Sequence, residues 1–271
     1  MSMKYELFTD GGINKEKKLS CGSAILLQNN NGNISLKSSA VKICSNSTNN
    51  EGELYGILKG IELVDGNNNI PYTLYSDSEY SINTLRNWIF NWFKSYTETR
   101  ENSIMIPCMK TGGGTDVKNL ELICTIINMI VDKRVNIRFK NVRGHMSVNS
   151  QNDISTQMEY YNSKNYDKID FNKAKDICKG NNTADQMCTN YINKFSNGTL
   201  CGGRNKHNII FYDNGTLVDI RHPNDDVKAE ASIRYPKYIM LNKAIMTMYA
   251  GLIGLKTGGV KNNENKNFRS R

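Results

Sequence analysis

The sequence predicts an α/β protein whose N-terminal part is an antiparallel sheet. Three short apolar segments, at residues 5–10, 21–28 and 32–41, are separated by polar or Asn-Gly turn sequences, which is typical of consecutive strands in a meander. After residue 48, strand-like segments alternate with segments whose apolar residues recur at helical spacing. This alternation predicts helices that pack against the sheet.

The composition favours a nucleic-acid partner. With 271 residues, the chain is long enough for one sizeable domain and a smaller one. Its 35 Lys and Arg exceed its 26 Asp and Glu, and the net charge of +9 suits a polyanion, nucleic acid before membrane. No apolar run approaches the roughly 20 residues of a membrane span, and the N-terminus lacks a signal-peptide pattern. The seven scattered cysteines contain no Cys-x-x-Cys pair, so we expect reduced thiols in a cytoplasmic protein and no zinc site.

The first strand runs directly into Asp10, Gly11 and Gly12. An Asp-Gly pair is most often a hairpin turn, and the lysine-rich residues 11–20 are predicted to be a loop. The alternative is that Asp10 is held at the tip of a central strand and points into a cleft. Three later acids in comparable positions favour this alternative.

The first predicted helix starts near residue 50, and Leu54 begins its apolar stripe. We expect Asn50 to be the N-cap, with Glu53 three residues later completing a capping box. That local role is sufficient to explain Glu53. The alternative is a first-turn carboxylate within reach of Asp10.

A brief strand is predicted at residues 72–76, and Asp77 follows it at the start of a second helix. Ser76 or Asp77 would be an ordinary N-cap for that helix. Asp77 is also an acid at the exit of a strand, where ligands gather in α/β folds. Both interpretations stay open on these residues alone.

Residues 85–94 combine aromatic and basic side chains. They are equally compatible with a helix that packs Trp88 and Trp92 into the core and with a nucleic-acid platform that also uses Lys94. The following residues 96–115 contain a lone proline and three consecutive glycines, so an irregular connection is predicted there.

A helix is predicted at residues 117–131 and a strand at 135–139, from their apolar periodicity. His145 follows the end of that strand in a Gly-His sequence. A single histidine after a glycine is usually a loop residue, but this one occupies the same kind of position as two of the acids.

The polar residues 146–179 resemble an insertion before the last core helix, which is predicted to open at Gly180. Asp185 would then lie in or near the first turn of that helix, where an acid is favourable to the helix dipole.

The C-terminal part is predicted to be a small α+β extension. A Gly-rich linker precedes a hairpin at 208–220, a helix at 238–255 and a basic tail at 256–271. We expect that removing the extension leaves the main fold intact. The predicted domains are residues 1–195 and 196–271.

Six motifs then occur in a defined order. They are Phe-Thr-Asp-Gly at Asp10, Thr-Asn-Asn-x-x-Glu-Leu at Glu53, Tyr-Ser-Asp-Ser-x-Tyr at Asp77, Asn-Trp-Ile-x-Asn-Trp ending at Trp92, Val-x-Gly-His at His145 and Gly-Asn-x-x-Ala-Asp at Asp185. This set resembles type 1 ribonuclease H over residues 4–195, the insertion excepted. The resemblance implies a ribonuclease H-like fold: a mixed five-stranded sheet of three antiparallel strands then two parallel ones, flanked by helices.

The resemblance also implies an active site. Asp10, Glu53, Asp77 and Asp185 would bind two Mg²⁺ ions, which Mn²⁺ can replace, and His145 would assist proton transfer or product release. Oxygen-only ligands suit such hard cations, and four carboxylates in one cleft would repel each other without them. The implied activity is endonucleolytic hydrolysis of the RNA strand of RNA–DNA hybrids by a monomeric enzyme, giving 5′-phosphate and 3′-hydroxyl ends.

The family's substrate contacts match further positions. Asn49 and Asn50 would contact RNA, Thr48 would bind a DNA phosphate, and Trp88 and Trp92 would line the DNA channel. Lys94, from the same aromatic and basic segment, is predicted to bind nucleic acid. Two departures from the family pattern concern the substrate: residues 13–18 replace a glycine-rich turn, and position 79 is Glu where a neutral amide is frequent.

Two alternatives stay open. The chain could be a hybrid- or nucleic-acid-binding module without turnover, although binding alone would not need four mutually repelling acids. It could also be a DNA or junction nuclease on the same fold.

Overall fold

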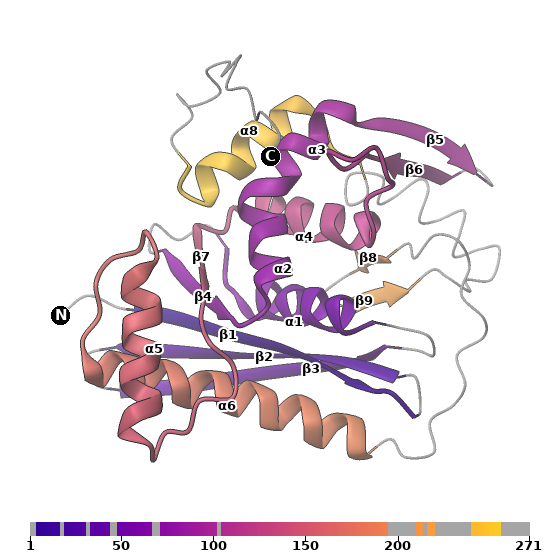
Figure 1. The fold of residues 1–271 in the computed structure, drawn as a ribbon. Helices are drawn as coiled ribbons and strands as arrows, with labels where there is room; N and C mark the ends of the chain where they lie inside the picture. The colour runs from indigo at the N-terminus through magenta and orange to yellow at the C-terminus, as the bar shows by residue number, and fades with distance from the viewer. Residues whose placement is uncertain are drawn as a thin grey trace, which may run out of the picture.

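The computed structural model describes residues 4–16, 19–30, 33–43, 48–66, 71–101, 104–194, 210–213, 216–219 and 240–255. Its centre is a five-stranded sheet with helices on both faces (Figure 1). The strands of this sheet are β1 (Lys4–Asn14), β2 (Leu19–Asn30), β3 (Asn33–Ile43), β4 (Tyr72–Ser76) and β7 (Ile137–Asn141).

The strand order is β3-β2-β1-β4-β7. The first three strands pair antiparallel, β4 runs parallel to β1, and β7 runs parallel to β4. This is the mixed sheet that the resemblance implied, so the predicted fold class is confirmed.

Alternate residues of the strands face two different cores, as the period of two along a strand requires. Leu7 and Leu26 point into a core built with helices on one face, whereas Phe8 and Ile25 point into a core on the other face. The first face carries α1 (Asn49–Leu63), α2 (Glu79–Asn83), α3 (Ile89–Trp92), α4 (Leu120–Asp132) and α8 (Lys243–Leu252). The second face carries α5 (Gln151–Ser163) and α6 (Phe171–Lys194).

Strand β1 extends through Asp10 to Asn14, so the predicted loop at 11–20 is wrong for most of its length. The polar half of β1 still pairs with β2, because Asp10 lies opposite Ser23 and Asn14 lies opposite Leu19. Asp10 and Gly11 therefore form no hairpin turn. Asp10 also lies within the strand, not at its tip as expected.

The N-cap of α1 is Thr48, and the predicted Asn50 cap is wrong. Thr48 has extended backbone angles, and its Oγ1 accepts a hydrogen bond of 3.3 Å from the Glu51 amide. Asn50 is already inside the helix, so the capping box with Glu53 does not form. This leaves the Glu53 carboxylate available for contacts outside its own helix.

The predicted irregular connection at 96–115 is also wrong. It contains an antiparallel hairpin of β5 (Thr97–Glu101) and β6 (Ile104–Cys108). Pro107 is tolerated because each strand of a two-stranded ribbon has a free edge that needs no amide donor. The glycines that suggested a loop form a turn between Lys110 and Asp116, which pair through their backbones and through a 2.6 Å ion pair.

Helix α6 begins at Phe171, nine residues before the predicted start at Gly180. The Asp170 Oδ1 accepts from the Lys173 amide at 2.8 Å, as an N-cap side chain does. Gly180 lies inside the helix because α6 packs closely against Phe8: a Cβ at position 180 would lie 2.4 Å from the phenyl ring. The glycine is a packing requirement of the second core, and Asp185 is well past the first turn.

The segment predicted as an insertion contributes α5 and the beginning of α6, from Phe171 to Lys179. Ser150 caps α5 by accepting from the Asp153 amide, and Tyr161 of α5 enters the second core. These residues therefore complete the covering of one sheet face.

The extension contains a hairpin of β8 (Ile210–Asp213) and β9 (Thr216–Asp219), as predicted. The predicted linker, Pro236 and the basic tail lie outside the described residues. The predicted helix is present as α8, but it begins later than residue 238 because Asn242 is its N-cap and accepts from the Ile245 amide at 2.9 Å.

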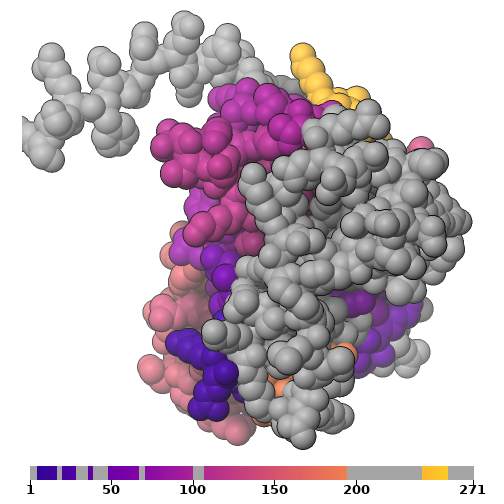
Figure 2. Space-filling model, turned by 90° about the vertical axis from the view of Figure 1, so that its right-hand side faces the viewer, coloured from indigo at the N-terminus to yellow at the C-terminus, as the bar shows by residue number. Residues whose placement is uncertain are grey.

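Helix α8 is integrated into the first core. Tyr249 is fully buried, stacks on Phe90 at 5.9 Å between ring centroids and donates its hydroxyl to the Leu85 carbonyl at 2.8 Å. Figure 1 places α8 at the same end of the molecule as α3 and the β5/β6 hairpin, and in Figure 2 the yellow residues of α8 lie at the top beside magenta residues. Removal of the whole extension would open this core, contrary to our expectation. The helices within the described ranges include none that is long and apolar enough to cross a membrane.

Candidate active site

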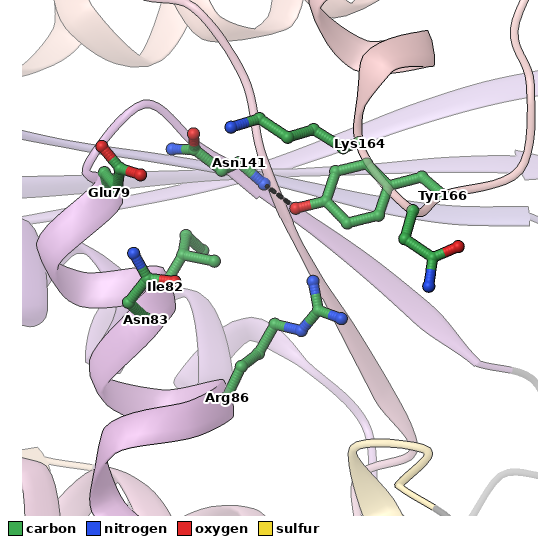
Figure 3. A pocket seen from close by; sticks show the side chains of 8 residues that line it. Glu79, Ile82, Asn83, Arg86, Asn141, Lys164 and Tyr166 are labelled. Carbon is green, nitrogen blue, oxygen red and sulfur yellow. Dashed lines mark hydrogen bonds between the residues drawn. The ribbon is translucent and has the colours of Figure 1, made fainter. Parts of the chain in front are cut away.

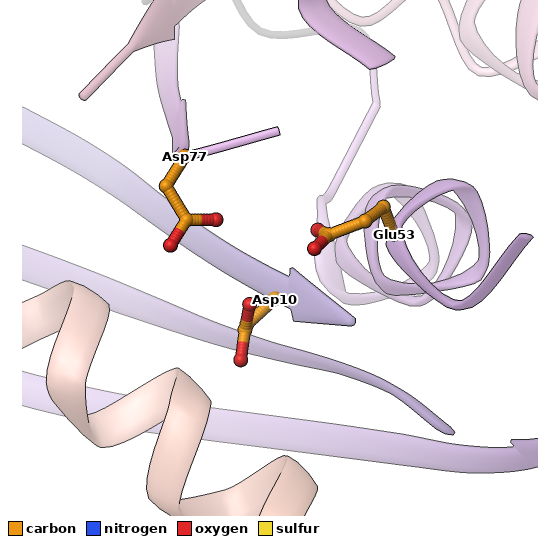
Figure 4. Close-up of side chains that lie close together, drawn as sticks. All are labelled: Asp10, Glu53 and Asp77. Carbon is orange, nitrogen blue, oxygen red and sulfur yellow. The ribbon is translucent and has the colours of Figure 1, made fainter. Parts of the chain in front are cut away.

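Three carboxylates meet where β1, α1 and the end of β4 come together. Asp10, Glu53 and Asp77 each offer a carboxylate oxygen, and these three atoms all lie within 4.8 Å of one another (Figure 4). Asp10 and Glu53 are buried, with 6% and 5% of their surfaces exposed, and Asp77 is partly buried.

The register of the parallel strands brings two of these acids together. Phe8 of β1 pairs with Tyr75 of β4, and their rings stack at 5.0 Å. Two residues beyond this last pair of the β1–β4 ladder, Asp10 of β1 and Asp77, the residue that follows β4, lie close together. The sheet itself therefore sets this pair.

The third acid is brought in by a close approach of α1 to β1. A Cβ on Gly11 would lie 2.1 Å from the Glu53 amide nitrogen, so only glycine permits this contact between helix and strand backbones. The contact places the first turn of α1 directly over the strand residue next to Asp10.

Asp77 is not the cap of the helix that follows it, and neither is Ser76, so that prediction is wrong. Ser78 is the N-cap of α2 and accepts from the Ser81 amide at 3.2 Å. The Asp77 carboxylate accepts instead from the Asn181 side chain of α6, with 3.4 Å between Oδ2 and Nδ2. Asp77 is thereby held toward the other two acids.

Asp185 and His145 complete the group. The Nδ1 of His145 lies 3.8 Å from the Oδ2 of Asp185, and the His145 side chain is 83% exposed. His145 has a left-handed backbone with φ of 56°. All five predicted catalytic residues line one cleft of about 490 Å³: Asp10, Glu53, Asp77, His145 and Asp185.

Burial and mutual repulsion make these acids hard to ionise. Burial, followed by the charges of Asp77 and Asp185, raises the pKa of Asp10 from 3.8 to about 8. Burial and the charges of Asp10 and Asp77 raise the pKa of Glu53 well above 4.5. Burial also raises the pKa of Asp77, while the hydrogen bond from Asn181 and the nearby His145 oppose that rise.

The three clustered acids have the properties of a divalent-cation site. Their donor atoms are all oxygens, as Mg²⁺ and Mn²⁺ prefer. The Glu53 Oε2 is buried and has no hydrogen-bond partner among the described residues. A cation would supply that partner and offset the repulsion between the carboxylates. The residues present therefore fit the predicted metal.

The predicted substrate-binding residues divide into two groups. Asn49 and Asn50 line the cleft. Thr48, Trp88, Trp92 and Lys94 do not line it, although the rings of Tyr80, Trp88 and Trp92 form a continuous chain of contacts from the cleft outward. Trp88 is 38% exposed, so it is not the core tryptophan that one interpretation predicted.

Sequence reasoning assigned no role to Asn181, which the structure places against Asp77. It is 1% exposed and lies four residues before Asp185, on the same face of α6. That spacing within the Gly-Asn-x-x-Ala-Asp motif was the signal that could have identified it.

The fold and the site define the class of protein: an α/β protein with a mixed sheet and an acidic, cation-compatible cleft over its central strands. The RNase H family model matches residues 2–159, which is more than half of the chain. The chain belongs to the RNase H family and is a hydrolase of the ribonuclease H type. The match ends within α5, so the place of Asp185 rests on the geometry described above.

Individual relatives agree with this assignment. A ribonuclease HI of Haemophilus ducreyi is 31% identical over 122 residues, which cover 44% of this chain and 67% of that protein. A ribonuclease H of Mannheimia succiniciproducens is 27% identical over 165 residues, which cover 61% of this chain and 90% of that protein.

Two solved structures are similar to a lesser degree. LC9-RNase H1, a type 1 RNase H with the type 2 active-site motif, aligns with a TM-score of 0.47 and 13% identity over 88% of this chain and 86% of that one. LC11-RNase H1 in complex with an RNA/DNA hybrid aligns with a TM-score of 0.36 and 16% identity, over 52% of this chain and 86% of that one.

Proposed function

We propose that the protein is an endonuclease that hydrolyses the RNA strand of RNA–DNA hybrids with the help of two Mg²⁺ ions, leaving 5′-phosphate and 3′-hydroxyl ends. The observation that carries the proposal is the cluster of Asp10, Glu53 and Asp77 oxygens within 4.8 Å, in a cleft that also contains Asp185 and His145. The family assignment and the names of the relatives support the choice of substrate.

Four carboxylates would hold the cations: Asp10, Glu53, Asp77 and Asp185. When bound, such a pair of cations supplies a nucleophilic water and neutralises charge on the attacking and leaving oxygens. The protein's part is to orient the carboxylates, and the positive charge of bound cations would favour their ionised forms. The pairing of β1 with β4, which ends at Phe8 and Tyr75, brings Asp10 and Asp77 close together, and the Asn181 hydrogen bond orients the Asp77 carboxylate.

His145 is suited to moving a proton at the edge of the site. Its imidazole is exposed, its Nδ1 faces Asp185, and it lines the cleft that holds the acids. Protonation of the leaving 3′ oxygen, or help in releasing the product, follows from that position.

The remaining predicted residues would select the hybrid. The amides of Asn49 and Asn50 line the cleft, where they can donate to and accept from a 2′-hydroxyl that only RNA carries. Thr48, Trp88, Trp92 and Lys94 would contact the DNA strand outside the cleft. The exposed indole of Trp88 offers a face for a sugar or base, and Lys94 offers a cation for a phosphate.

The test is cleavage of end-labelled substrates with Mg²⁺, with Mn²⁺ and with EDTA. We expect the RNA strand of an RNA–DNA hybrid to be cut only with metal, and duplex DNA, duplex RNA and a four-way DNA junction to stay intact. Mapping the product ends checks the 5′-phosphate. Cutting of the junction or of duplex DNA would identify a DNA nuclease, and binding of the hybrid without any cut would identify a binding module.

A further inference from the structure

A second cavity, of about 180 Å³, adjoins the active-site cleft, and Glu79 lines both. One wall of the cavity comes from α2 and the π-helical turn η1 (Thr84–Trp88), which supply Asn83 and Arg86. The other wall comes from the segment that joins α5 to α6, which supplies Lys164 and Tyr166 (Figure 3). We call it the side cavity.

The side cavity is lined by two cations, Arg86 and Lys164, and one carboxylate, Glu79, so the charge of its lining is positive on balance. Arg86 and Lys140 both lie over the ring of Tyr166, at 5.4 Å and 4.2 Å from its centroid, and Lys164 lies 4.4 Å from the ring of Tyr160. No carboxylate within the described residues forms an ion pair with any of these three cations. Aromatic faces orient cations without neutralising them, so the positive charge remains available to a ligand.

The wall that carries Lys164 is fixed by hydrogen bonds. The Asn141 amide donates to the Tyr166 hydroxyl at 3.0 Å, and the Tyr160 hydroxyl donates to the Asn141 side chain. Further along, Asn162 exchanges two hydrogen bonds with the backbone of Ile169. The cavity is therefore built into the fold before any ligand binds.

The cations next to the cavity repel one another. Burial lowers the pKa of Lys140, and the neighbouring Arg86 and Arg138 lower it further, against the opposing effect of Asp167. An anion placed between Arg86 and Lys164 would relieve this repulsion.

The size and position of the cavity identify the kind of anion. A volume of 180 Å³ is smaller than the roughly 300–1,000 Å³ of sites that enclose a whole small molecule, so it suits a single phosphate group. Because Glu79 borders both spaces, a strand that leaves the active-site cleft along α2 passes the mouth of the side cavity.

We propose that the side cavity is a phosphate-binding subsite for the nucleic-acid strand that leaves the active-site cleft past Glu79, with Arg86 and Lys164 as its phosphate ligands. This inference rests on the proposed function, because that function supplies the strand. It gives the α5–α6 segment a role in substrate binding. It also explains how Glu79 is tolerated beside substrate phosphates, since Arg86 and Lys164 line the same cavity and offset its charge.

The test is equilibrium binding of a fluorescein-labelled RNA–DNA hybrid in EDTA, measured by anisotropy from about 50 to 200 mM salt. Each lost phosphate contact lowers the slope of log K against log salt by about 0.9. We expect the double variant Arg86→Gln/Lys164→Gln to raise the Kd for the hybrid by roughly tenfold and to lower that slope by about 1 to 2. Glu79→Gln should tighten binding, and Lys175→Gln, an exposed cation of α6 outside the cavity, should change nothing.

The result that overturns the subsite is a double variant that binds the hybrid with the wild-type Kd and salt slope. If circular dichroism shows that the double variant is unfolded, the single variant Lys164→Gln is measured in its place. Its side chain is partly exposed, so this substitution leaves the core packing unchanged. Inorganic phosphate and a 5′-mononucleotide form a second arm. If they bind the wild type and not the double variant while hybrid binding is equal, the cavity serves free phosphate and the strand assignment is wrong. Because these measurements need no cleavage, a wild type that fails to cut any hybrid would overturn the proposed function separately.

Discussion

The side chain of Asn181 donates a hydrogen bond to Asp77 across 3.4 Å and so connects the middle of α6 to the end of β4. Asn181 is almost completely buried, and its own Oδ1 has no partner among the described residues. Of the contacts that oppose the raised pKa of Asp77, this hydrogen bond is the largest. Asn181 therefore acts as a positioning residue for a predicted metal ligand.

Replacing Asn181 by Ala should raise the pKa of Asp77 further, because the hydrogen bond stabilises the ionised carboxylate. Metal binding needs that ionised form, so the acidic limb of the cleavage-rate profile should move to higher pH by roughly 1 unit. The measurement is kcat/KM against pH. Thr183→Ala is the control, since Thr183 is exposed and donates to the Lys179 carbonyl within α6. An unshifted limb would remove Asn181 from the site.

The metal-free protein should lose stability as pH rises from about 4 to about 8. The folded state raises the pKa of Asp10 from 3.8 to about 8, so it holds a proton that the unfolded chain has already released within this window. Stabilisation is complete below the unfolded value and is lost as pH approaches the folded one. Urea unfolding in EDTA at several pH values measures the loss, which should be on the order of a few kcal/mol.

Two comparisons make this stability test specific. Asp10→Asn has no proton to lose at that position, so its stability should depend less on pH across the same window. Excess Mg²⁺ should restore stability to the wild type at pH 8, because a ligand that binds only the folded state stabilises it. A wild type whose stability in EDTA is flat from pH 4 to 8 would contradict the raised pKa.

Asp77→Asn should abolish cleavage and keep hybrid binding. The substitution preserves the shape of the side chain and removes one anionic ligand of the cluster, so the rate should fall by at least about 10²-fold. Binding persists because the change removes negative charge and no phosphate contact. Gel-based cleavage and anisotropy measure the two effects, with Asp176→Asn on the exposed face of α6 as control. Full activity would exclude Asp77 from the catalytic set.

His145→Asn should slow turnover without eliminating it. Asn tolerates the left-handed backbone at φ of 56°, so the loop keeps its shape while the imidazole is lost. The side chain is 83% exposed, which leaves the fold unaffected. We expect kcat to fall by roughly 10²-fold, within the range of general acid–base catalysis, with KM unchanged. An unchanged kcat in single-turnover measurements would mean that His145 takes no part in the proton transfer.

Tyr249 should be a stability determinant despite its distance in sequence from the rest of the core. Tyr249→Ala empties a fully buried position and should cost roughly 3–5 kcal/mol in unfolding free energy. Tyr249→Phe loses only the hydrogen bond to the Leu85 carbonyl and should cost about 1–3 kcal/mol. Met248→Ala, on the exposed side of α8, is the control. Equal urea midpoints for all three variants would show that α8 does not stabilise the core.

The sequence predicted those features that depend on local periodicity and on motif order. Alternation and turn residues identified all five strands of the main sheet, and the helical spacing of Leu120, Ile123 and Ile127 identified α4. The order of the acidic motifs identified the residues that the fold brings into one cleft. Each of these signals is contained in a short stretch of chain.

The features that escaped prediction depend on contacts between distant segments. Gly180 suggested a helix start because nothing in its neighbours reveals the Phe8 ring against it. Asn50 suggested a cap because it is an equally good cap residue two positions after Thr48. The integration of α8 depends on Leu85 and Phe90, more than 150 residues away from Tyr249 in sequence.

The late position of α8 in the chain has a consequence for biosynthesis. A ribosome makes the five strands of the main sheet and α1 before α8, and until Tyr249 emerges its place beside Leu85 is empty. Nascent chains that have not yet released α8 expose apolar surface that the finished protein covers, so they are natural clients for chaperones. Premature stop codons before residue 240 should accordingly yield insoluble fragments that still contain Asp10, Glu53, Asp77 and Asp185.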